Sequence, residues 1–335
     1  MHSEKQNNEF PIDAVITWVN GNDSSWQEKM NSFREEKIDF SNKRQSVRFN
    51  SIGEIDIAIL SIIKYAGFVR NIFLVTDQQK PDAFDEFVSV AKASKINLVL
   101  IDHKTIFKGF EHVLPCFNSC SIGTMLYRVP NLAEHFIIFN DDTFLMRETT
   151  PCDFFIDGKP IVRGNWARFN EDRVLRKVFK KMSAFLGKKT KQSTSFKTFQ
   201  QRSAKLAGTK KYVRRFHTPV SIRKSTVEAF FEGKEKLLEQ NISHRFRNRG
   251  QFIISSLSEH LEIAADTYHY SKDTNLTYFR NYKNPTAVKK KLKHFLGDPS
   301  KKFMTFQSLE TADSETLDYI QNWISERLEI KPDLN

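Results

Sequence analysis

Two adjacent aspartates, Asp141 and Asp142, are the residues whose type and position point most directly to chemistry. They follow the run HFIIFN, which ends on Asn140 and is typical of a buried strand. Neighbouring carboxylates repel each other when both are ionised, so a cation or a catalytic role should offset the cost. Such hard oxygen ligands suit Mg²⁺ or Mn²⁺, which also neutralises charge on a diphosphate leaving group. The alternative is a helix cap or a turn, because Asn and Asp favour both.

Three arginines alternate with other residues in the segment HRFRNRG. In an extended chain Arg245, Arg247 and Arg249 would share one face. Guanidinium forks suit phosphate oxygens, and a phosphoryl transition state needs such charge. A solvated loop is the alternative interpretation of the same pattern.

A single histidine, His217, lies in the segment RRFHTPV, after two arginines and before a proline. Near neutral pH an imidazole can act as a general base or bind phosphate. A lone histidine is more often structural. A catalytic role for His217 therefore needs support from the residues that lie near it in the fold.

Strand and helix signals alternate in the first half of the chain. The predicted strands are 12–19, 71–76, 96–101 and 135–140, and the predicted helices are 24–36 (capped by Ser24 or Ser25), 52–65, 82–93 and a short one from about 119. This order predicts an α/β fold, an open and mainly parallel sheet with helices on both faces. Such sheets bind ligands at the carboxyl ends of their strands.

Polar residues follow four of the predicted strands. They are 20–23, Asp77, Asp102 and 140–142. Because carboxyl ends of parallel strands share one edge of a sheet, we expect these side chains to converge on one site.

The second half of the chain is more basic and more helical. Helices are predicted at 225–239 and 314–328, and the segment LEIAADTYHY at 261–270 is strand-like. We expect an α/β core at 1–170, a basic helical insertion at 171–215, and a segment at 216–335 that completes the site. All three would form one catalytic domain.

The chain carries 52 basic and 40 acidic residues, a formal charge of +12, which suits an anionic partner or a simply solvated surface. The run KKKLK at 289–293 is most simply a solvated helix face. The first ten residues contain no apolar core of a secretory signal, and no run approaches the roughly 20 apolar residues of a spanning helix. Three cysteines match no zinc pattern and are expected to be reduced. We expect a cytoplasmic protein, with peripheral contact to the anionic inner membrane face as an additional hypothesis.

Three blocks of the sequence together resemble the Stealth family of sugar-phosphate transferases. They are IDAVITWVNGNDSSW at 12–26, the segment from RFNSIGEIDIAIL through LPCFNSCSI to FNDDTFLM at 48–146, and the segment from FHTPVSIRKS to HRFRN at 216–248. Members of that family include bacterial capsule polymerases and the catalytic subunit of the animal lysosomal-tagging phosphotransferase.

The resemblance implies an A-type glycosyltransferase-like sheet and a specific reaction. An acceptor hydroxyl of a saccharide or lipid-linked glycan would attack the sugar-bearing phosphorus of a UDP-sugar. UMP would leave and a phosphodiester would remain, with Mg²⁺ or Mn²⁺ as cofactor. The setting would be bacterial capsule or cell-surface polysaccharide synthesis, and residues 1–170 would bind the nucleotide sugar.

The resemblance also implies roles for residues that match its blocks. Asn140, Asp141 and Asp142 belong to the carboxylate motif, in which the two aspartates would hold the metal. The later catalytic blocks contain His217, Arg245 and Arg247, and the donor-site blocks contain Asn20, Asp23, Arg48, Asp77 and Asn118. Either Asp142 or His217 would be the base.

Two departures from the family pattern stand out. The first block commonly carries aspartate where this chain has Asn20. The final block usually carries an Asn-Asp pair after its apolar run, where this chain has Gln307 and Ser308. Glu310 or Asp313 could then supply the ligand.

Two alternative functions fit parts of the sequence. A conventional glycosyltransferase would use the same carboxylates but release UDP. A basic polyanion-binding protein would explain the net charge but gives no reason for Asp141 and Asp142 at a strand end. We therefore expect no nucleic-acid partner.

Overall fold

The computed structural model describes residues 10–42, 52–172 and 195–329. Its central sheet has the strand order β10-β4-β1-β2-β3. The strands are β1 (Ile12–Thr17), β2 (Val69–Thr76), β3 (Asn97–Asp102), β4 (His135–Asn140) and β10 (Val220–Arg223). Strands β1 to β4 are parallel, and β10 runs antiparallel to β4 at the edge. The mainly parallel, open sheet expected from the sequence is thus confirmed.

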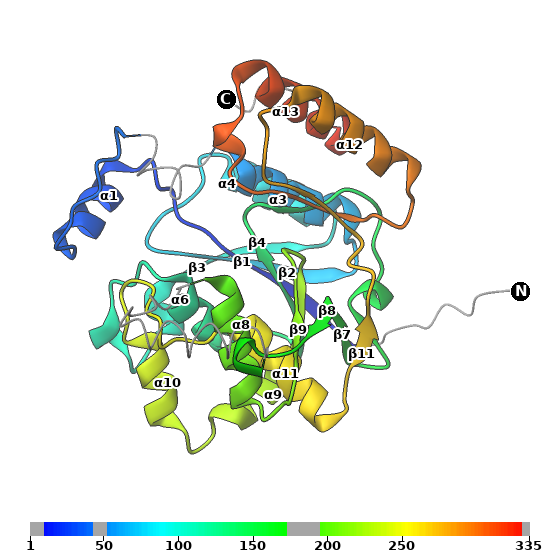
Figure 1. The fold of residues 1–335 in the computed structure, drawn as a ribbon. Helices are drawn as coiled ribbons and strands as arrows, with labels where there is room; N and C mark the ends of the chain where they lie inside the picture. The colour runs from blue at the N-terminus through cyan, green and yellow to red at the C-terminus, as the bar shows by residue number, and fades with distance from the viewer. Residues whose placement is uncertain (1–9, 43–51, 173–194, 330–335) are drawn as a thin grey trace, which may run out of the picture.

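Helices cover both faces of this sheet (Figure 1). On one face lie α3 (Glu54–Tyr65) and α4 (Phe84–Ala93), and on the other lie α6 (Ser119–Met125), α9 (Lys224–Phe231), α10 (Glu235–Ile242) and α11 (Ile254–Ala265). Side chains of β1 alternate between the two layers: Ala14 and Ile16 pack toward α3, whereas Val15 packs toward α6. Central strands buried on both sides explain the continuous apolar runs of the sequence.

A small second sheet joins the carboxyl-terminal part of the chain to the residues after Asp142. Its order is β12 (Leu276–Phe279), β13 (Phe303–Phe306) and β5 (Thr143–Leu145). Helices α12 (Pro285–Gly297) and α13 (Ser314–Leu328) pack on this sheet and lie beyond α3 in Figure 1. Because β13 pairs antiparallel with β5, the chain around residue 305 lies beside the turn that carries the two aspartates.

The remaining elements lie around the central sheet. Strands β11 (His269–Ser271), β7 (Lys159–Arg163) and β6 (Phe155–Ile156) form one small sheet, and β8 (Asn165–Ala167) pairs with β9 (Tyr212–Arg214). Helix α8 (Phe196–Leu206) packs on α11 through Ser203, whose hydroxyl donates to the carbonyl of Ile253 at 3.0 Å. Short α5 (His103–Ile106) follows β3, and α1 (Ser24–Ser32) stands at the left of Figure 1.

The predicted first helix needs two corrections. Its cap is Asp23 rather than Ser24 or Ser25, because the Asp23 carboxylate accepts hydrogen bonds from the main chain of Ser25 and Trp26. The helix ends at Ser32 instead of about residue 36. The other helices of the first half and the helix at 314–328 agree with prediction to within a few residues.

Two predictions in the second half were wrong. The helix predicted at 225–239 is two helices, α9 and α10, because Gly233 adopts a left-handed φ of +67° between them. The first half of the strand-like segment at 261–270 is the end of α11, which closes where Asp266 turns left-handed at φ +55°, and only its last two residues lie in a strand, β11. Buried Leu257 and Glu262 hold this helix against the sheet, so tertiary packing overrides the local strand pattern.

The three predicted segments of the chain are interleaved. Residues 173–194, about half of the predicted basic insertion, lie outside the described residues, and the rest of it forms α8 and β9. The last segment contributes β10 to the central sheet and β13 to the second sheet.

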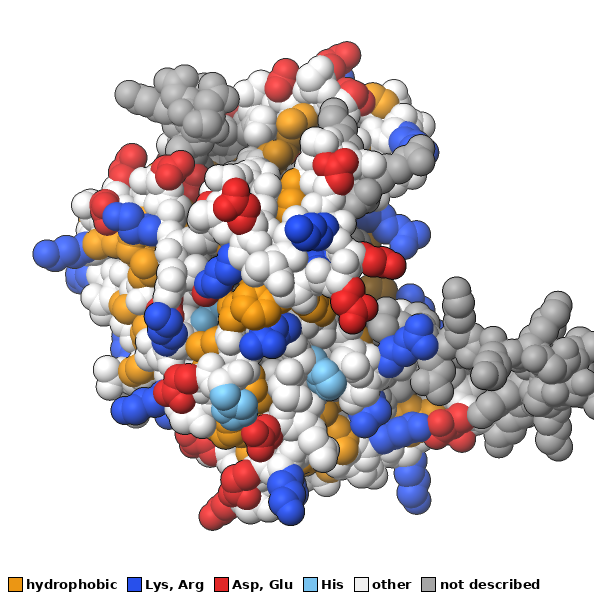
Figure 2. All heavy atoms as spheres, turned by 90° about the vertical axis from the view of Figure 1, so that its left-hand side faces the viewer, with side chains coloured by type: hydrophobic (Ala, Val, Ile, Leu, Met, Phe, Trp, Pro, Cys, Tyr) orange, Lys and Arg blue, Asp and Glu red, His pale blue; other side chains and the backbone are white. Residues whose placement is uncertain are grey.

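All three cysteines have free thiols, and Cys116 and Cys120 are buried. Among the described residues, no helix combines the length and apolar character that crossing a membrane requires. Figure 2 shows Lys and Arg side chains interspersed with Asp and Glu over the face at the left of Figure 1. On that face the basic surplus does not form one continuous patch.

Candidate active site

Asp141 and Asp142 form the turn between β4 and β5 and are half-buried. Burial, and then the proximity of Asp142 and Glu54, raises the pKa of Asp141, and burial also raises the pKa of Asp142. The Thr143 hydroxyl lies 3.3 Å from Oδ1 of Asp142, and the main chain of Phe306 donates to the Asp142 carbonyl at 3.1 Å. The pair is therefore held on a rigid turn while its negative charge stays only weakly balanced.

Two further carboxylates add to this charge. Glu54 opens α3, is buried, and accepts a hydrogen bond from the main chain of Ile52 at 2.7 Å. Glu310 lies in the 3₁₀ turn Leu309–Thr311 after β13, and burial followed by the charges of Glu54 and Asp142 raises its pKa to about 7. Its Oε1 is buried with no hydrogen-bond partner among the described residues. Four carboxylates from three parts of the chain thus lie close enough to influence one another's pKa.

This donor set fits a hard divalent cation. In the described part of the chain no three carboxylate, imidazole or thiol groups form a ready-made coordination cluster. Mg²⁺ usually takes only one or two carboxylates and completes its shell with water and substrate phosphates. Asp141 and Asp142 meet that requirement, and the unpaired oxygen of Glu310 leaves negative charge for a cation to neutralise.

Of the two acids that could replace the family's Asn-Asp pair, only Glu310 faces this cluster. The Asp313 carboxylate caps α13, where it accepts from the main chain of Thr316 at 2.9 Å and from its hydroxyl at 3.0 Å. The amide oxygen of Gln307 accepts a hydrogen bond from the Tyr278 hydroxyl.

The main chain of His217 is tied to the strand that pairs with the carboxylate turn. Its ring is stacked between Phe196 and Tyr278, with ring centroids 5.7 and 5.5 Å apart. Its carbonyl accepts the hydroxyl proton of Thr305, which lies on β13 opposite Thr143 of β5. Burial, and to a lesser extent the charge of Arg215, lowers the pKa of His217 to about 4, so the imidazole is neutral near pH 7.

A second group of predicted residues lies after β1 and β2. Gln79 joins them: its Oε1 accepts from the main chain of Asn20 at 2.8 Å, and its Nε2 donates to Oδ2 of Asp23 at 2.8 Å. Asp77 forms an ion pair with Lys29 of α1 at 2.9 Å. The carboxylates of Asp23 and Asp77 therefore organise the loop and α1, and any contact of theirs with a nucleotide stays a prediction.

A third group is built around Asn118, the buried cap of α6. Its Nδ2 donates to the carbonyl of His244 at 2.8 Å and to Oε1 of Gln251 at 2.9 Å, which fixes the intervening loop. Arg247 of that loop donates to the Ser119 hydroxyl at 2.8 Å. The arginine segment is thus a loop tied to the start of α6, rather than an extended strand with one arginine face.

Arg245 combines a fixed position with an unused donor. It donates to the Leu114 carbonyl at 3.3 Å and lies over the ring of Phe33, 4.6 Å from its centroid. Its Nε is buried without a hydrogen-bond partner in the described residues. Phe33 follows α1, and Trp26 of α1 packs edge-on against Phe117 at 5.6 Å, so α1 connects this third group to the second.

The predicted site residues therefore fall into three groups along the carboxyl edge of the sheet. The carboxylates and His217 form one, the residues after β1 and β2 the next, and Asn118 with its arginines the last. Asn140 is the exposed final residue of β4. Arg48 lies outside the described residues. Sequence reasoning missed Glu54, which looks like an ordinary first-turn acid, and Gln79 and Lys29, which no local pattern distinguishes.

Comparison with known proteins agrees with the resemblance of the first two sequence blocks to the Stealth family. Residues 10–38 match the model of Stealth protein conserved region 1, and residues 48–162 match that of conserved region 2. The solved apo-form glycosyltransferase GlyE of Streptococcus pneumoniae TIGR4 aligns over 96% of this chain and 61% of its own, with a TM-score of 0.41 and 10% identity.

Two curated relatives extend the match. Exopolysaccharide phosphotransferase cps2G of Lactiplantibacillus plantarum is 40% identical over 152 residues, which cover 45% of this chain but only 41% of that protein. Receptor polysaccharide phosphotransferase WefC of Streptococcus gordonii is 32% identical over 259 residues, which cover 71% of this chain and 73% of its own length. The chain belongs to the Stealth protein family.

Proposed function

We propose that this protein transfers a sugar 1-phosphate from a UDP-sugar to a hydroxyl of a glycan acceptor in capsule or exopolysaccharide synthesis. Membership in the Stealth family and likeness to polysaccharide phosphotransferases support the class of reaction. The observation that carries the proposal is the cluster of Asp141, Asp142 and Glu310 at the carboxyl edge of a parallel sheet, with unbalanced negative charge.

Asp141 and Asp142 would hold one Mg²⁺ or Mn²⁺ ion, with Glu310 in place of the family's Asn-Asp pair. Such an ion would neutralise charge on the diphosphate and on the leaving UMP. Without a cation the carboxylates oppose an anionic substrate, so the same cluster makes donor binding depend on metal.

Arg245 and Arg247 would bind the diphosphate through their guanidinium groups. The buried Nε of Arg245 has no hydrogen-bond partner among the described residues, so a phosphate oxygen that displaced the atoms covering it would gain a donor without breaking an existing bond. Asn118 holds the loop of both arginines in place before substrate arrives, which lowers the cost of ordering them.

His217 would take the proton from the attacking hydroxyl. A neutral imidazole can accept that proton, and the low pKa of His217 keeps it neutral in the free protein. An anionic substrate placed beside the ring raises this pKa and makes the imidazole a stronger base. Asp142 is the alternative base, but a carboxylate engaged with a cation accepts a proton poorly.

The nucleotide product tests the proposal. Purified protein is incubated with a UDP-sugar, Mg²⁺ and acceptor, and the nucleotides are separated by chromatography. Sugar-phosphate transfer releases UMP and gives a phosphodiester signal by phosphorus NMR. Release of UDP without such a signal identifies a conventional glycosyltransferase and refutes the proposal.

The proposal includes a cytoplasmic location, with peripheral contact to anionic membrane through basic helices such as α12. Sedimentation with anionic lipid vesicles at low salt tests the membrane contact. Protein that stays entirely in the supernatant contradicts it.

A further inference from the structure

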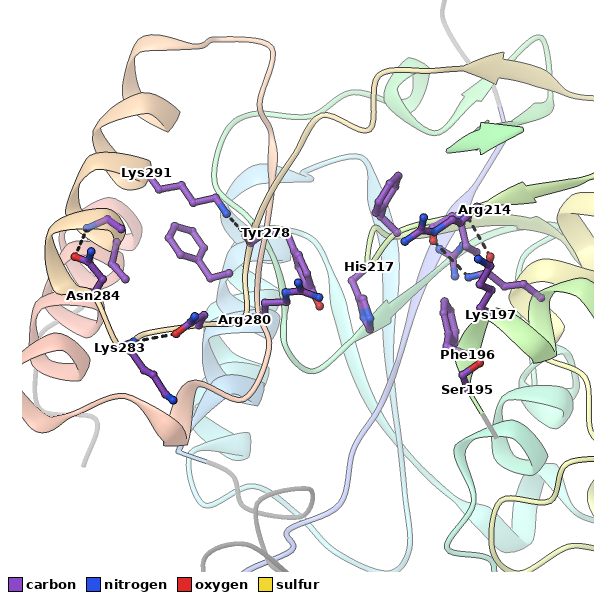
Figure 3. A pocket seen from close by; sticks show the side chains of 17 residues that line it. Ser195, Phe196, Lys197, Arg214, His217, Tyr278, Arg280, Lys283, Asn284 and Lys291 are labelled. Atoms are coloured by element: carbon purple, nitrogen blue, oxygen red, sulfur yellow. Dashed lines mark hydrogen bonds between the residues drawn. The ribbon is translucent and has the colours of Figure 1, made fainter. Parts of the chain in front are cut away.

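His217 lines a cavity of about 770 Å³. Three parts of the chain line it: the start of α8, the segment 214–217 before β10, and the segment from Tyr278 to Lys291. Figure 3 shows His217 between the two sides, with Arg214, Lys197 and Phe196 on one and Arg280, Lys283 and Lys291 on the other. The volume falls in the range of ligand pockets in general.

The charge of this cavity has one sign. Its lining includes Lys197, Arg214, Arg215, Arg280, Lys283 and Lys291, and none of the described lining residues is Asp or Glu. Cations brought together in a cavity with no acidic side chain in its described lining repel one another, so a bound anion would offset that cost.

Two of these cations are available to a ligand. The side chains of Arg280 and Lys283 are exposed and make no hydrogen bond or ion pair with the described residues. Arg215, by contrast, is buried and pairs with Glu259 at 3.4 Å, and Lys291 donates to the Tyr278 carbonyl. Arg215 and Lys291 are held in place by these contacts, whereas Arg280 and Lys283 can contact an anionic group of a ligand.

Aromatic rings complete the lining. Phe196 and Tyr278 stack on the two faces of the His217 ring, and Phe196 remains 40% exposed. Aromatic surface beside a few convergent polar groups suits a molecule with both apolar faces and charge. A sugar ring attached to a phosphate has that combination.

The position of the cavity favours the acceptor over the donor. None of the residues assigned to donor binding lines it, including Asn118 and Arg245. His217 lines it, and the same residue is tied through Thr305 to the strand beside Asp142. A hydroxyl bound in this cavity would therefore lie near the proposed base without contacting the residues assigned to the donor.

We infer that this cavity binds an anionic glycan acceptor through a phosphodiester group, which Arg280 and Lys283 contact. The inference rests on the proposed function. In each transfer the acceptor oxygen bonds to the sugar-bearing phosphorus, the bond from that phosphorus to the UMP oxygen breaks, and the hydroxyl proton passes to His217. The product then carries a phosphodiester near its end and itself fits the cavity, so one transfer prepares the acceptor for the next.

Binding measurements with a matched pair of probes test the inference. One probe has two glucose units joined through a 1→6 phosphodiester, and the other is isomaltose, in which the same units are joined directly. Titration calorimetry of the full chain at low salt should show at least tenfold tighter binding of the phosphodiester probe. Arg280→Ala and Lys283→Ala should each weaken that binding about tenfold, whereas UDP binding should not change.

Lys290→Ala is the control, because it removes an exposed lysine of α12 that does not line the cavity. It should leave binding of both probes unchanged. Equal binding of the two probes, no binding of either, or an equal loss in the control overturns the inference. Weaker UDP binding in Arg280→Ala or Lys283→Ala also overturns it, because the cavity would then hold the donor.

These readouts do not depend on turnover. If the nucleotide product is UDP, the proposed function fails while the binding result stands. If the product is UMP and the probes bind equally, the proposed function stands and the acceptor inference fails.

Discussion

Thr305 donates its hydroxyl proton to the main-chain carbonyl of His217 at 2.8 Å, and its oxygen lies 3.2 Å from the hydroxyl of Thr143. Thr143 directly follows Asp142. One buried threonine of β13 therefore sets the position of the proposed base relative to the carboxylate turn.

Replacing Thr305 by Val keeps the shape and removes the hydroxyl. We expect a loss of about 1 kcal/mol in unfolding free energy and a lower kcat with little change in donor KM, because the residue positions His217 without touching substrate. Thr305→Ser retains the hydroxyl and should retain most of kcat. Steady-state kinetics and urea unfolding measure both effects, and a wild-type kcat in Thr305→Val would contradict this role.

The two aspartates should be essential for turnover and dispensable for folding. Asp141→Asn and Asp142→Asn should each lower the rate of UMP release by about 100-fold or more, because each removes a charge from the proposed cation site. Since burial raises the pKa of both groups, and the charge of Asp142 raises that of Asp141 further, each replacement should leave thermal stability without metal unchanged or higher. Wild-type rates in both variants would refute the carboxylate assignment.

Glu310 and Asp313 can be told apart by a matched pair of substitutions. Glu310→Gln should lower turnover and weaken activation by Mg²⁺, because the Glu310 carboxylate lies in the field of Asp142 and Glu54. Asp313→Ala removes the cap of α13 and should cost about 1 kcal/mol of stability while leaving metal activation unchanged. A titration of rate against Mg²⁺ concentration provides the measurement. The reverse pattern would assign the metal site to Asp313.

Arg245 and Arg249 provide a similar comparison within one loop. Arg245→Ala should abolish most turnover in a folded protein, since it removes a fixed guanidinium with a free Nε. Arg249 is exposed, and its replacement by Ala should change the rate by less than about threefold. Rates measured at saturating donor, together with circular dichroism spectra, separate catalysis from folding. Equal losses in the two variants would indicate a general charge effect.

The pH dependence of stability should depend on His103, which is buried at 1% exposure. Burial lowers the pKa of His103 to about 4, against the nearby charges of Asp77 and Asp102 that act to raise it. The folded protein therefore binds fewer protons than the unfolded chain between pH 4 and 6.5, and stability contributed by this group falls as pH drops through that window.

His103→Leu removes that contribution. Between pH 7 and 5 the wild type should lose about 2 kcal/mol more unfolding free energy than the variant. Carboxylates with raised pKa, such as Glu259, act in the opposite direction, so the difference between the two proteins is the informative quantity. Parallel urea curves at pH 7 and 5 measure it. Identical pH dependence in both proteins would show that the pKa of His103 is the same in the folded protein and in the unfolded chain.

The central sheet was predictable because each of its parallel strands is indicated by its own short stretch of sequence. The runs that form β1 to β4 are apolar and β-branched, and each ends on polar turn residues. The faces of α3 were also predictable, since Ile55, Ile59 and Ile62 recur at helical spacing and are all buried.

The completed site was not predictable in the same way. Glu310 joins the carboxylates only because β13 pairs with β5 across nearly half of the chain. Asp23 and Asp77 were predicted as donor ligands, yet partners far away in sequence, Gln79 and Lys29, engage them. Pairings of this kind depend on packing between distant elements, which no spacing rule in the sequence records.

The antiparallel strand β10 determines whether an amino-terminal fragment of the chain can fold without the rest. It covers the outer edge of β4, whose main chain would otherwise present unpaired hydrogen-bonding groups. A fragment that ends with the second conserved region, at residue 162, lacks this strand and exposes the edge of the largely apolar β4. Such a fragment should aggregate rather than fold. We therefore expect that the two conserved regions together do not fold as an independent domain.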